Sequence, residues 1–147
     1  MQKVTPFLWF DGNAEEAATF YASVFKKSKV GKAVSGPDGK VMVVPFEIQG
    51  QEFTALNGGP RFKFNESVSF VVHCKDQKEV DYYWEKLTSG GGQESMCGWL
   101  KDKYGLSWQV VPDVLPKLLR GPKAGNVMQA FMQMRKFDIA ALERAAA

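Results

Sequence analysis

Histidine and cysteine are scarce in this chain of 147 residues, which has one histidine, His73, and two cysteines, Cys74 and Cys97. Zinc and most catalytic transition metals are held by histidine and cysteine together with a few carboxylates, so a site rich in these ligands is excluded. Two cysteines also do not make the disulfide framework of a small secreted domain. We therefore expect a cytoplasmic protein.

Long apolar runs and runs of like charge are also missing. No stretch approaches the roughly 20 apolar residues that a membrane-spanning helix needs, and the first residues show no signal-peptide pattern. Lysine and arginine are scattered, and the net charge is only +3. We expect neither a membrane nor a nucleic acid as a partner.

Aromatic residues, by contrast, are plentiful, at 13% of the chain with eleven Phe and four Trp. Such side chains fill a core, line a ligand cavity or cover a subunit interface, and composition alone does not choose among these. The length suits a single domain, residues 1–147, with a sizeable core.

Hydrophobic periodicity predicts a mixture of strands and helices. Strands are expected at residues 4–10, 30–35, 41–48, 52–56, 67–74, 93–100 and 106–111, and helices at 14–25, between Asp76 and Gly90, at 114–119 and at 127–142 with an interruption near Phe137. Asn13 and Asp76 are expected to cap the first two helices, each with a glutamate three residues later. Pro45, inside a strand, indicates a sheet edge or a bulge.

The two strand-to-helix units repeat at an offset of 63 positions, which places Asn13 on Asp76 and Glu16 on Glu79. The apolar positions of the two helices coincide at the same offset. The repeat predicts two βαβββ modules, residues 4–60 and 66–112, followed by a helical tail at residues 113–147.

Three segments carry a resemblance to a known family: Thr5–Ala17, Ala55–Pro60 and Cys97–Gln109. They resemble the PhnB-like family of the glyoxalase/bleomycin resistance/dioxygenase, or vicinal oxygen chelate, superfamily, a family also labelled 3-demethylubiquinone-9 3-methyltransferase. The resemblance covers about residues 4–143. It implies an α+β fold of paired βαβββ modules with mixed, curved sheets, here followed by C-terminal helices, and a homodimer.

Enzymes of this superfamily typically hold a divalent metal with a histidine or glutamate from the first strand and a glutamate from the last strand of the modules. By position, these ligand slots fall near Pro6, on Ser69, near Ala55 and on Gln109. None of the four is a histidine or a carboxylate, so we expect no metal at this position and no cofactor.

No catalytic residue stands out. His73 is interpreted as a satisfied or surface histidine, with a general-base role as the alternative. Cys97 is interpreted as a small buried residue in a strand, with a nucleophile as the alternative. A Rossmann-type methyltransferase needs a glycine-rich turn between a strand and the helix that follows. The segment Gly90–Gly92 instead follows a helix and precedes a strand, so the motifs do not support methyl transfer.

The remaining candidate is a cavity with apolar walls and a few polar groups, as small organic ligands prefer. The residues expected to line it are Trp9, Phe53, Asn57, Phe62, Phe64, Met96, Trp99, Trp108 and Gln109. The neighbouring Arg61 and Lys63 are interpreted as a solvated loop, with pairing to an anionic ligand as the alternative.

These observations favour a homodimer that binds a small organic molecule. Two alternatives stay open. One is a metal-dependent lyase, isomerase or dioxygenase with an atypical site that uses Glu47, Glu52 or Glu94. The other is a structural or interaction protein whose aromatic surface is mostly subunit interface.

Overall fold

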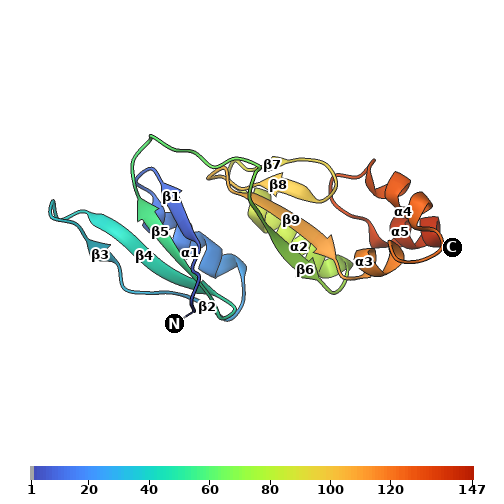
Figure 1. Ribbon diagram of the computed structural model, residues 1–147, viewed down its shortest axis with the longest axis horizontal. Coiled ribbons are helices and arrows are strands. Elements are labelled where there is room, and N and C mark those ends of the chain that lie inside the picture. Colours follow the sequence, from blue (N-terminus) through green and yellow to red (C-terminus); the bar gives the residue numbers. More distant parts are fainter. Residues whose placement is uncertain (1) are drawn as a thin grey trace. The chain divides into compact units, whose positions relative to one another are not determined.

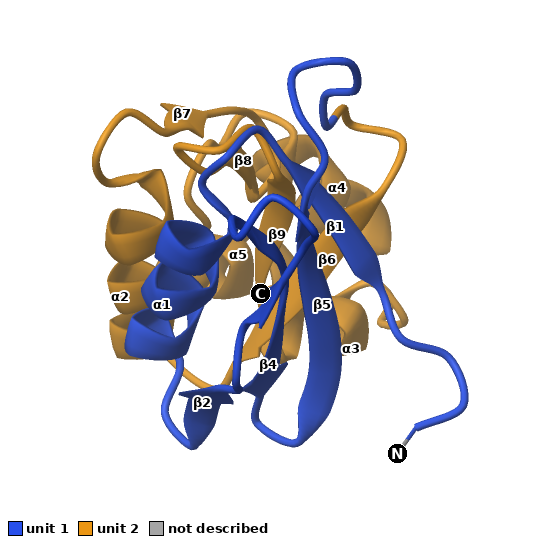
Figure 2. Ribbon diagram, turned by 90° about the vertical axis from the view of Figure 1, so that its left-hand side faces the viewer, with its two compact units in different colours: residues 1–64 blue, residues 65–147 orange. Residues whose placement is uncertain are grey.

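The computed structural model describes residues 2–147. They divide into two compact units, one up to Phe64 and one from Asn65 to Ala147 (Figure 2). The boundary falls in the segment between the two predicted modules.

The first unit is a mixed sheet with a helix on one face (Figure 1). Its elements are β1 (Phe7–Phe10), α1 (Ala14–Val24), β2 (Ser28–Val30), β3 (Val34–Ser35), β4 (Val41–Ile48) and β5 (Gln51–Asn57). The sheet order is β1-β5-β4-β2, and β3 also pairs with β4. Strand β1 runs parallel to β5, and the other pairs are antiparallel.

The second unit repeats this plan and adds the tail. Its elements are β6 (Ser69–Cys74), α2 (Gln77–Thr88), β7 (Gln93–Glu94), β8 (Trp99–Lys101), β9 (Ser107–Pro112), α3 (Val114–Leu118), α4 (Ala124–Phe131) and α5 (Ile139–Ala146). The sheet order is β6-β9-β8-β7, with β6 parallel to β9. Both units therefore place the first strand of the module beside the last, and the predicted α+β fold of two βαβββ modules with C-terminal helices is confirmed.

The core of each unit lies between its sheet and its helix. In the first unit Phe46 stacks on Phe53 with ring centroids 5.1 Å apart, and Tyr21 of α1 stacks on Phe46 at 5.8 Å. In the second unit the buried apolar side chains of the sheet and of α2 are Val72, Cys74, Val80, Trp84, Leu87, Leu100, Trp108 and Val110. Burial of this apolar area is the main stabilising contribution to each unit.

Helix α2 is capped as predicted, whereas α1 is capped by a different residue. Asp76 Oδ1 accepts a hydrogen bond from the Glu79 amide at 2.9 Å. Asn13 occupies the N-cap position of α1, but its side chain makes no capping hydrogen bond. Asn57, at the end of β5, accepts from the Ala14 amide at 2.8 Å instead. A cap that comes from a strand 43 residues away cannot be found from local sequence.

Pro45 explains why the strand expected at residues 30–35 is divided. Strands β2 and β3 pair with β4 on either side of Pro45, with Val30 opposite Phe46 and Val34 opposite Val43. A proline has no amide to donate, so the ladder breaks there. Gly31 donates to the Pro45 carbonyl at 2.7 Å. The predicted sheet edge is therefore wrong, because β4 is an interior strand, and the irregularity lies instead in the partner strand, which is divided opposite Pro45.

The strand expected at residues 93–100 is also divided, by a turn at Ser95–Gly98. Cys97 and Gly98 have φ angles of +60° and +80°, which no extended strand contains. A Cβ at Gly98 would lie 2.4 Å from Phe137 Cε2, so only glycine fits beneath that ring.

The tail is fastened to the second unit by backbone and side-chain hydrogen bonds. The Cys97 and Gly98 amides donate to the carbonyls of Met134 and Arg135 at 2.7 and 2.8 Å. Gln77 donates to the Phe137 carbonyl and accepts from the Ile139 amide. The break predicted near Phe137 is confirmed, but it is longer than expected, because α4 ends at Phe131 and α5 begins at Ile139.

Among the helices described between residues 2 and 147, none is both long and apolar enough to cross a membrane.

Candidate functional site

Each sheet has a helix face, which α1 or α2 covers, and an open face, which its own helix does not cover. Side chains alternate between the two faces along a strand. The register of the paired first and last strands therefore decides which residues share the open face. Val71 pairs with Gln109 in the second unit, and Phe7 pairs with Thr54 in the first.

The repeat of 63 positions holds for the helices and slips by one residue in the preceding strands. Helices α1 and α2 begin at Ala14 and Gln77, which are 63 apart, but β1 and β6 end at Phe10 and Cys74, which are 64 apart. The turn before α2 is one residue shorter. His73, which the uniform offset matches to the buried Phe10, therefore lies exposed on the open face.

The two ligand slots of the second module, Ser69 and Gln109, come together in the structure. Gln109 Nε2 donates to Ser69 Oγ at 2.9 Å, across the parallel pair of β6 and β9. Trp99 on β8 lies directly opposite Gln109 on the other side. A tryptophan and a hydrogen-bonded pair of neutral polar side chains thus stand side by side on this open face.

In the first module the corresponding slots fall one residue away from those named from the sequence. Ala55 is fully buried on the helix face. Thr54 lies on the open face beside Phe7, and Thr5 stands two residues before Phe7 in the same hollow. The one-residue slip of β1 against β6 accounts for the shift from Pro6 to Thr5. The matching registers of Phe7 with Thr54 and of Val71 with Gln109 account for the shift from Ala55 to Thr54.

The donors at these four positions do not fit a tightly held divalent metal. They are the hydroxyls of Thr5, Thr54 and Ser69 and the amide of Gln109, none of which carries charge. Over the described residues 2–147, the structure contains no group of three or more His, Cys, Asp or Glu side chains that could share an ion.

The open face of the second unit borders a hollow of about 610 Å³. It is lined by Glu66, Gln93, Glu94, Ser95, Met96, Cys97, Trp99, Leu100, Lys101 and Ser107. Two of the residues expected at a cavity, Met96 and Trp99, are in its wall, and Gln109 lies beside Trp99 on the neighbouring strand. An ion pair joins Lys101 Nζ to Glu66 Oε1, and the hydrogen bond from Lys101 lowers the pKa of the Glu66 carboxyl.

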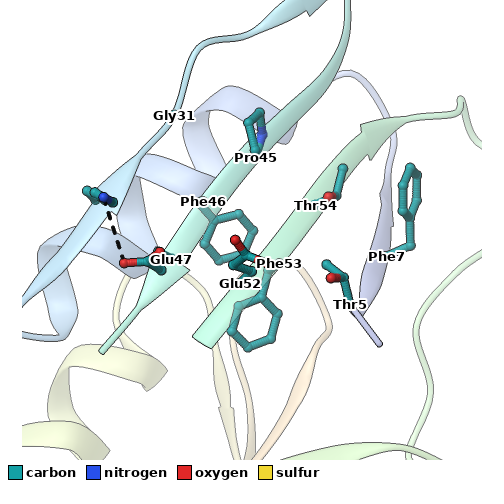
Figure 3. Close-up of a pocket in the computed structure, with 10 residues that line it drawn as sticks. Thr5, Phe7, Gly31, Pro45, Phe46, Glu47, Glu52, Phe53 and Thr54 are labelled. Atoms are coloured by element: carbon teal, nitrogen blue, oxygen red, sulfur yellow. Dashed lines mark ion pairs between the residues drawn. The ribbon is translucent and has the colours of Figure 1, made fainter. Parts of the chain in front are cut away.

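The open side of the first unit borders a smaller hollow of about 310 Å³, shown in Figure 3. Phe53, another residue expected at a cavity, contributes to its wall. Glu47 and Glu52 lie opposite each other on β4 and β5. Lys29 Nζ lies 4.0 Å from Glu47 Oε2, and Glu52 Oε2 accepts from the Gln2 amide at 3.1 Å, so both carboxylates already have partners.

Asn57 borders a third hollow, of about 760 Å³, near the turn at Gly36–Lys40. Its side chain is used by the fold, because Oδ1 caps α1 and Nδ2 donates to the Val41 carbonyl at 3.0 Å. Asn57 therefore has a structural role that the sequence did not reveal.

The other residues expected at a cavity lie in separate places. Trp9 donates through Nε1 to the Gly59 carbonyl and meets Phe62 edge to face, with centroids 4.9 Å apart. Phe64 meets Phe10 edge to face at 5.3 Å. Trp108 lies in the core of the second unit and donates through Nε1 to Asp102 Oδ2 at 2.9 Å. Whether any of them touches a ligand stays a prediction.

The two cysteines lie in different surroundings. Cys74 is fully buried, and burial raises the pKa of its thiol to about 12, helped by the carboxylates of Glu79, Asp113 and Asp76. Such a thiol stays protonated and unreactive. Cys97 was expected to be buried in a strand, but it lies half-buried in the turn between β7 and β8, in the wall of the larger hollow. Neither thiol forms a disulfide.

Sequence reasoning did not name Lys101 and Ser107, which lie in the wall of the larger hollow, among the candidate residues. Both share the open face with Gln109, since Lys101 pairs with Ser107 and Ser107 pairs with Ser69. The alternation of the strand, counted from Gln109, is the signal that would have found Ser107.

Comparisons with known proteins agree with this geometry. The family model described as 3-demethylubiquinone-9 3-methyltransferase matches residues 2–111. A PhnB protein from Bacillus cereus, described as a 3-demethylubiquinone-9 3-methyltransferase, is 34% identical, covering 76% of this chain and 99% of its own, with a TM-score of 0.69. Comparison with curated proteins finds no match.

More distant solved structures share the fold. The fosfomycin resistance protein FosX from Listeria monocytogenes is 15% identical, with 82% of this chain and 100% of its own covered and a TM-score of 0.58. A glyoxalase-related enzyme from Fulvimarina pelagi is 16% identical, with 78% and 91% covered and a TM-score of 0.50. This chain thus belongs to the 3-demethylubiquinone-9 3-methyltransferase, or PhnB-like, family, and has the fold of the glyoxalase superfamily.

Proposed function

We propose that this chain is a small-molecule-binding protein that works as a cytoplasmic homodimer and holds its ligand without the divalent metal of its superfamily. The observation that carries the proposal is the open face of the second unit, where Trp99 lies beside the hydrogen-bonded pair of Ser69 and Gln109. An aromatic wall supplies apolar contact, and a few neutral hydrogen-bonding groups orient a small organic ligand.

The absence of charge at the ligand slots supports binding over metal catalysis. The FosX relative is described as complexed with Mn(II) and sulfate. In this chain the pair at the corresponding strands offers one hydroxyl and one amide, which are weak ligands for such an ion. Gln109 keeps the shape and hydrogen-bonding capacity of a glutamate and lacks its charge.

Methyl transfer, which the family description names, is not part of the proposal. The glycines of the chain do not form the strand-turn-helix cradle of a Rossmann-type donor site, since Gly90–Gly92 lie between α2 and β7.

The homodimer is supported by the sheet edges. Strands β1 and β6 each end a sheet, and apolar side chains on and near them are exposed, including Phe7 at 60% and Val71 at 43%. An unpaired edge with exposed apolar side chains favours association with a second copy. Light scattering on the protein as it elutes from a size-exclusion column should give the mass of a dimer. The Phe7→Asp variant should give a mass closer to that of the monomer.

A second candidate is an atypical metal-dependent enzyme, favoured by the facing carboxylates of Glu47 and Glu52 in the smaller hollow. Metal analysis of the purified protein by plasma mass spectrometry separates the two proposals. We expect no stoichiometric divalent ion. An ion present at one equivalent per subunit and lost in Glu52→Gln would favour the second candidate.

The binding proposal itself is tested by a thermal-shift screen with small aromatic compounds and antibiotics. We expect at least one compound to raise the melting temperature of the native protein and to lose its effect in Trp99→Ala. Tyr82→Ala, which removes an exposed aromatic side chain from α2 on the other face of the sheet, is the matched control and should respond as the native protein does. No shift with any compound would contradict the proposal.

A further inference from the structure

Ser107 is a fully buried polar residue whose hydroxyl has no hydrogen-bond partner among residues 2–147. A buried hydroxyl without a partner costs stability, and native proteins rarely keep one without a reason. Ser107 also belongs to the wall of the 610 Å³ hollow. The unpaired hydroxyl of Ser107 therefore points to a ligand that binds in this hollow.

The neighbours of Ser107 on the open face form a row of polar groups. Ser107 lies between Ser69 on β6 and Lys101 on β8, each directly opposite it in register. Ser69 already accepts the hydrogen bond from Gln109. Lys101 supplies the cation of the row, and its side chain is 35% exposed.

The Lys101 ammonium group is already paired, because Glu66 forms an ion pair with it. Its carboxylate pairs with Lys101 Nζ, but the side chain is 63% exposed and lies in the turn before β6. Exposed ion pairs of this kind contribute little and open readily. The Glu66 carboxylate thus stands where the acid group of a ligand would stand.

Glu94, the second glutamate in the wall of the hollow, does not repel an anion bound on the open face. Glu94 pairs with Leu100, whose side chain is buried on the helix face, whereas Gln93 pairs with Lys101. Glu94 contributes to the wall of the hollow, but by strand alternation its side chain does not share the face of Lys101. Once Glu66 moves away, the Lys101 ammonium group on the open face can form an ion pair with an anionic ligand.

We propose that this hollow binds a small organic acid, whose acid group displaces Glu66 from Lys101 and hydrogen-bonds to Ser107 while its apolar part packs on Trp99 and Met96. The inference rests on the proposed binding function and adds the charge class of the ligand to it. Charge-assisted hydrogen bonds to an acid group are the strongest polar contacts that the row can make. The buried hydroxyl of Ser107 would gain its missing partner in the same step.

The test compares acids with their neutral amides. Benzoate and phenylacetate are titrated against benzamide and phenylacetamide at low salt, and binding is followed at the Trp99 indole signal by NMR. Glu66→Gln frees Lys101, so it should tighten the binding of the acids by about tenfold and leave the amides unchanged. Lys101→Gln should weaken the acids by about tenfold or more, and Lys103→Gln, which removes a charge from the adjoining turn, is the matched control.

Ser107→Ala gives a second, independent measurement. Removal of an unpaired buried hydroxyl should leave the melting temperature unchanged or raise it. The same change should weaken the binding of the acids, an effect of opposite sign that a merely structural residue would not produce.

The outcomes separate this inference from the function on which it rests. In one outcome, the Glu66→Gln variant binds the amides and the acids equally well while Lys101→Gln changes neither affinity. That result would contradict the proposed anion site and leave the proposed small-molecule site in place. If Ser107→Ala leaves the affinity for the acids unchanged, the role of its hydroxyl is wrong. If no acid and no amide binds either the native protein or Glu66→Gln, both the inference and the proposed function are contradicted.

Discussion

Gln109 donates a hydrogen bond of 2.9 Å to Ser69, and this bond links the last strand of the second module to its first through two neutral side chains. Enzymes of the superfamily typically use these strands to hold a metal. Here the same strands hold a polar pair beside Trp99. In the proposed function this pair orients the ligand, and its lack of charge disfavours a tightly held ion.

Replacing Gln109 by glutamate should give only weak metal binding. The new carboxylate would have the Ser69 hydroxyl as its neighbour, and one carboxylate with one hydroxyl binds Mn²⁺ no more tightly than about millimolar. The double variant Ser69→His with Gln109→Glu should bind more tightly, because imidazole adds a strong ligand. Calorimetric titration with MnCl₂ measures both, and micromolar affinity in the single variant would mean that a further ligand lies within reach.

Asp102, in the turn between β8 and β9, should be the side chain on which the hairpin of these two strands depends most. It is 3% exposed and accepts hydrogen bonds from the Tyr104 and Leu106 amides and from Trp108 Nε1. Asp102→Ala leaves these donors without their acceptor and should lower the free energy of unfolding by about 3 kcal/mol. Asp38→Ala, in an exposed turn, is the matched control and should cost well under about 1 kcal/mol in the same urea titration. Equal costs for the two variants would contradict this role.

The side chain of Gln77 should hold the turn that contains Cys97 and Gly98, which lines the larger hollow, in a fixed conformation. It makes two hydrogen bonds to the tail, whose carbonyls in turn accept from the Cys97 and Gly98 amides. Gln77→Ala should cost about 1–3 kcal/mol and should speed hydrogen exchange at Cys97 and Gly98 more than in β9. Uniform acceleration over the whole second unit would instead indicate global unfolding.

Cys74 should make the protein less stable at alkaline pH. The folded state keeps the thiol proton up to a pKa of about 12, against an ordinary value of 9.0, so it binds this proton more tightly than the unfolded chain does. The contribution is fully present below pH 9 and is lost as the pH rises from there toward 12. The free energy of unfolding of Cys74→Ala should fall less steeply over this range. A thiol reagent at neutral pH should label Cys97 and spare Cys74, and rapid labelling of both would contradict the burial of Cys74.

The fold was largely readable from the sequence because its signals are local. Apolar, β-branched runs located β4 and β6, and the Asp76 cap with Glu79 located α2. The repeat then predicted the topology of both modules. Details that depend on distant contacts were missed. Asn57 caps α1 from another strand, and Phe137 covers Gly98 from the tail.

The candidate site was readable only in part. Met96 and Trp99 lie in the wall of the larger hollow and Gln109 pairs with Trp99, and sequence could bring the three together because residues 96–109 are continuous. Trp108 alternates to the helix face, and its burial against Asp102 follows from that single step along the strand. The ion pair of Lys101 with Glu66 joins segments 35 residues apart and left no local trace.

The most direct test of the central claim is an NMR titration that follows the side-chain amide of Gln109 and the indole of Trp99. We predict that a small organic compound found by the thermal-shift screen shifts both signals saturably, and that Mn²⁺ or Zn²⁺ at equimolar concentration leaves them unchanged. Perturbation of the Gln109 amide by an equimolar divalent ion, with no response to any compound, would contradict a metal-free binding site.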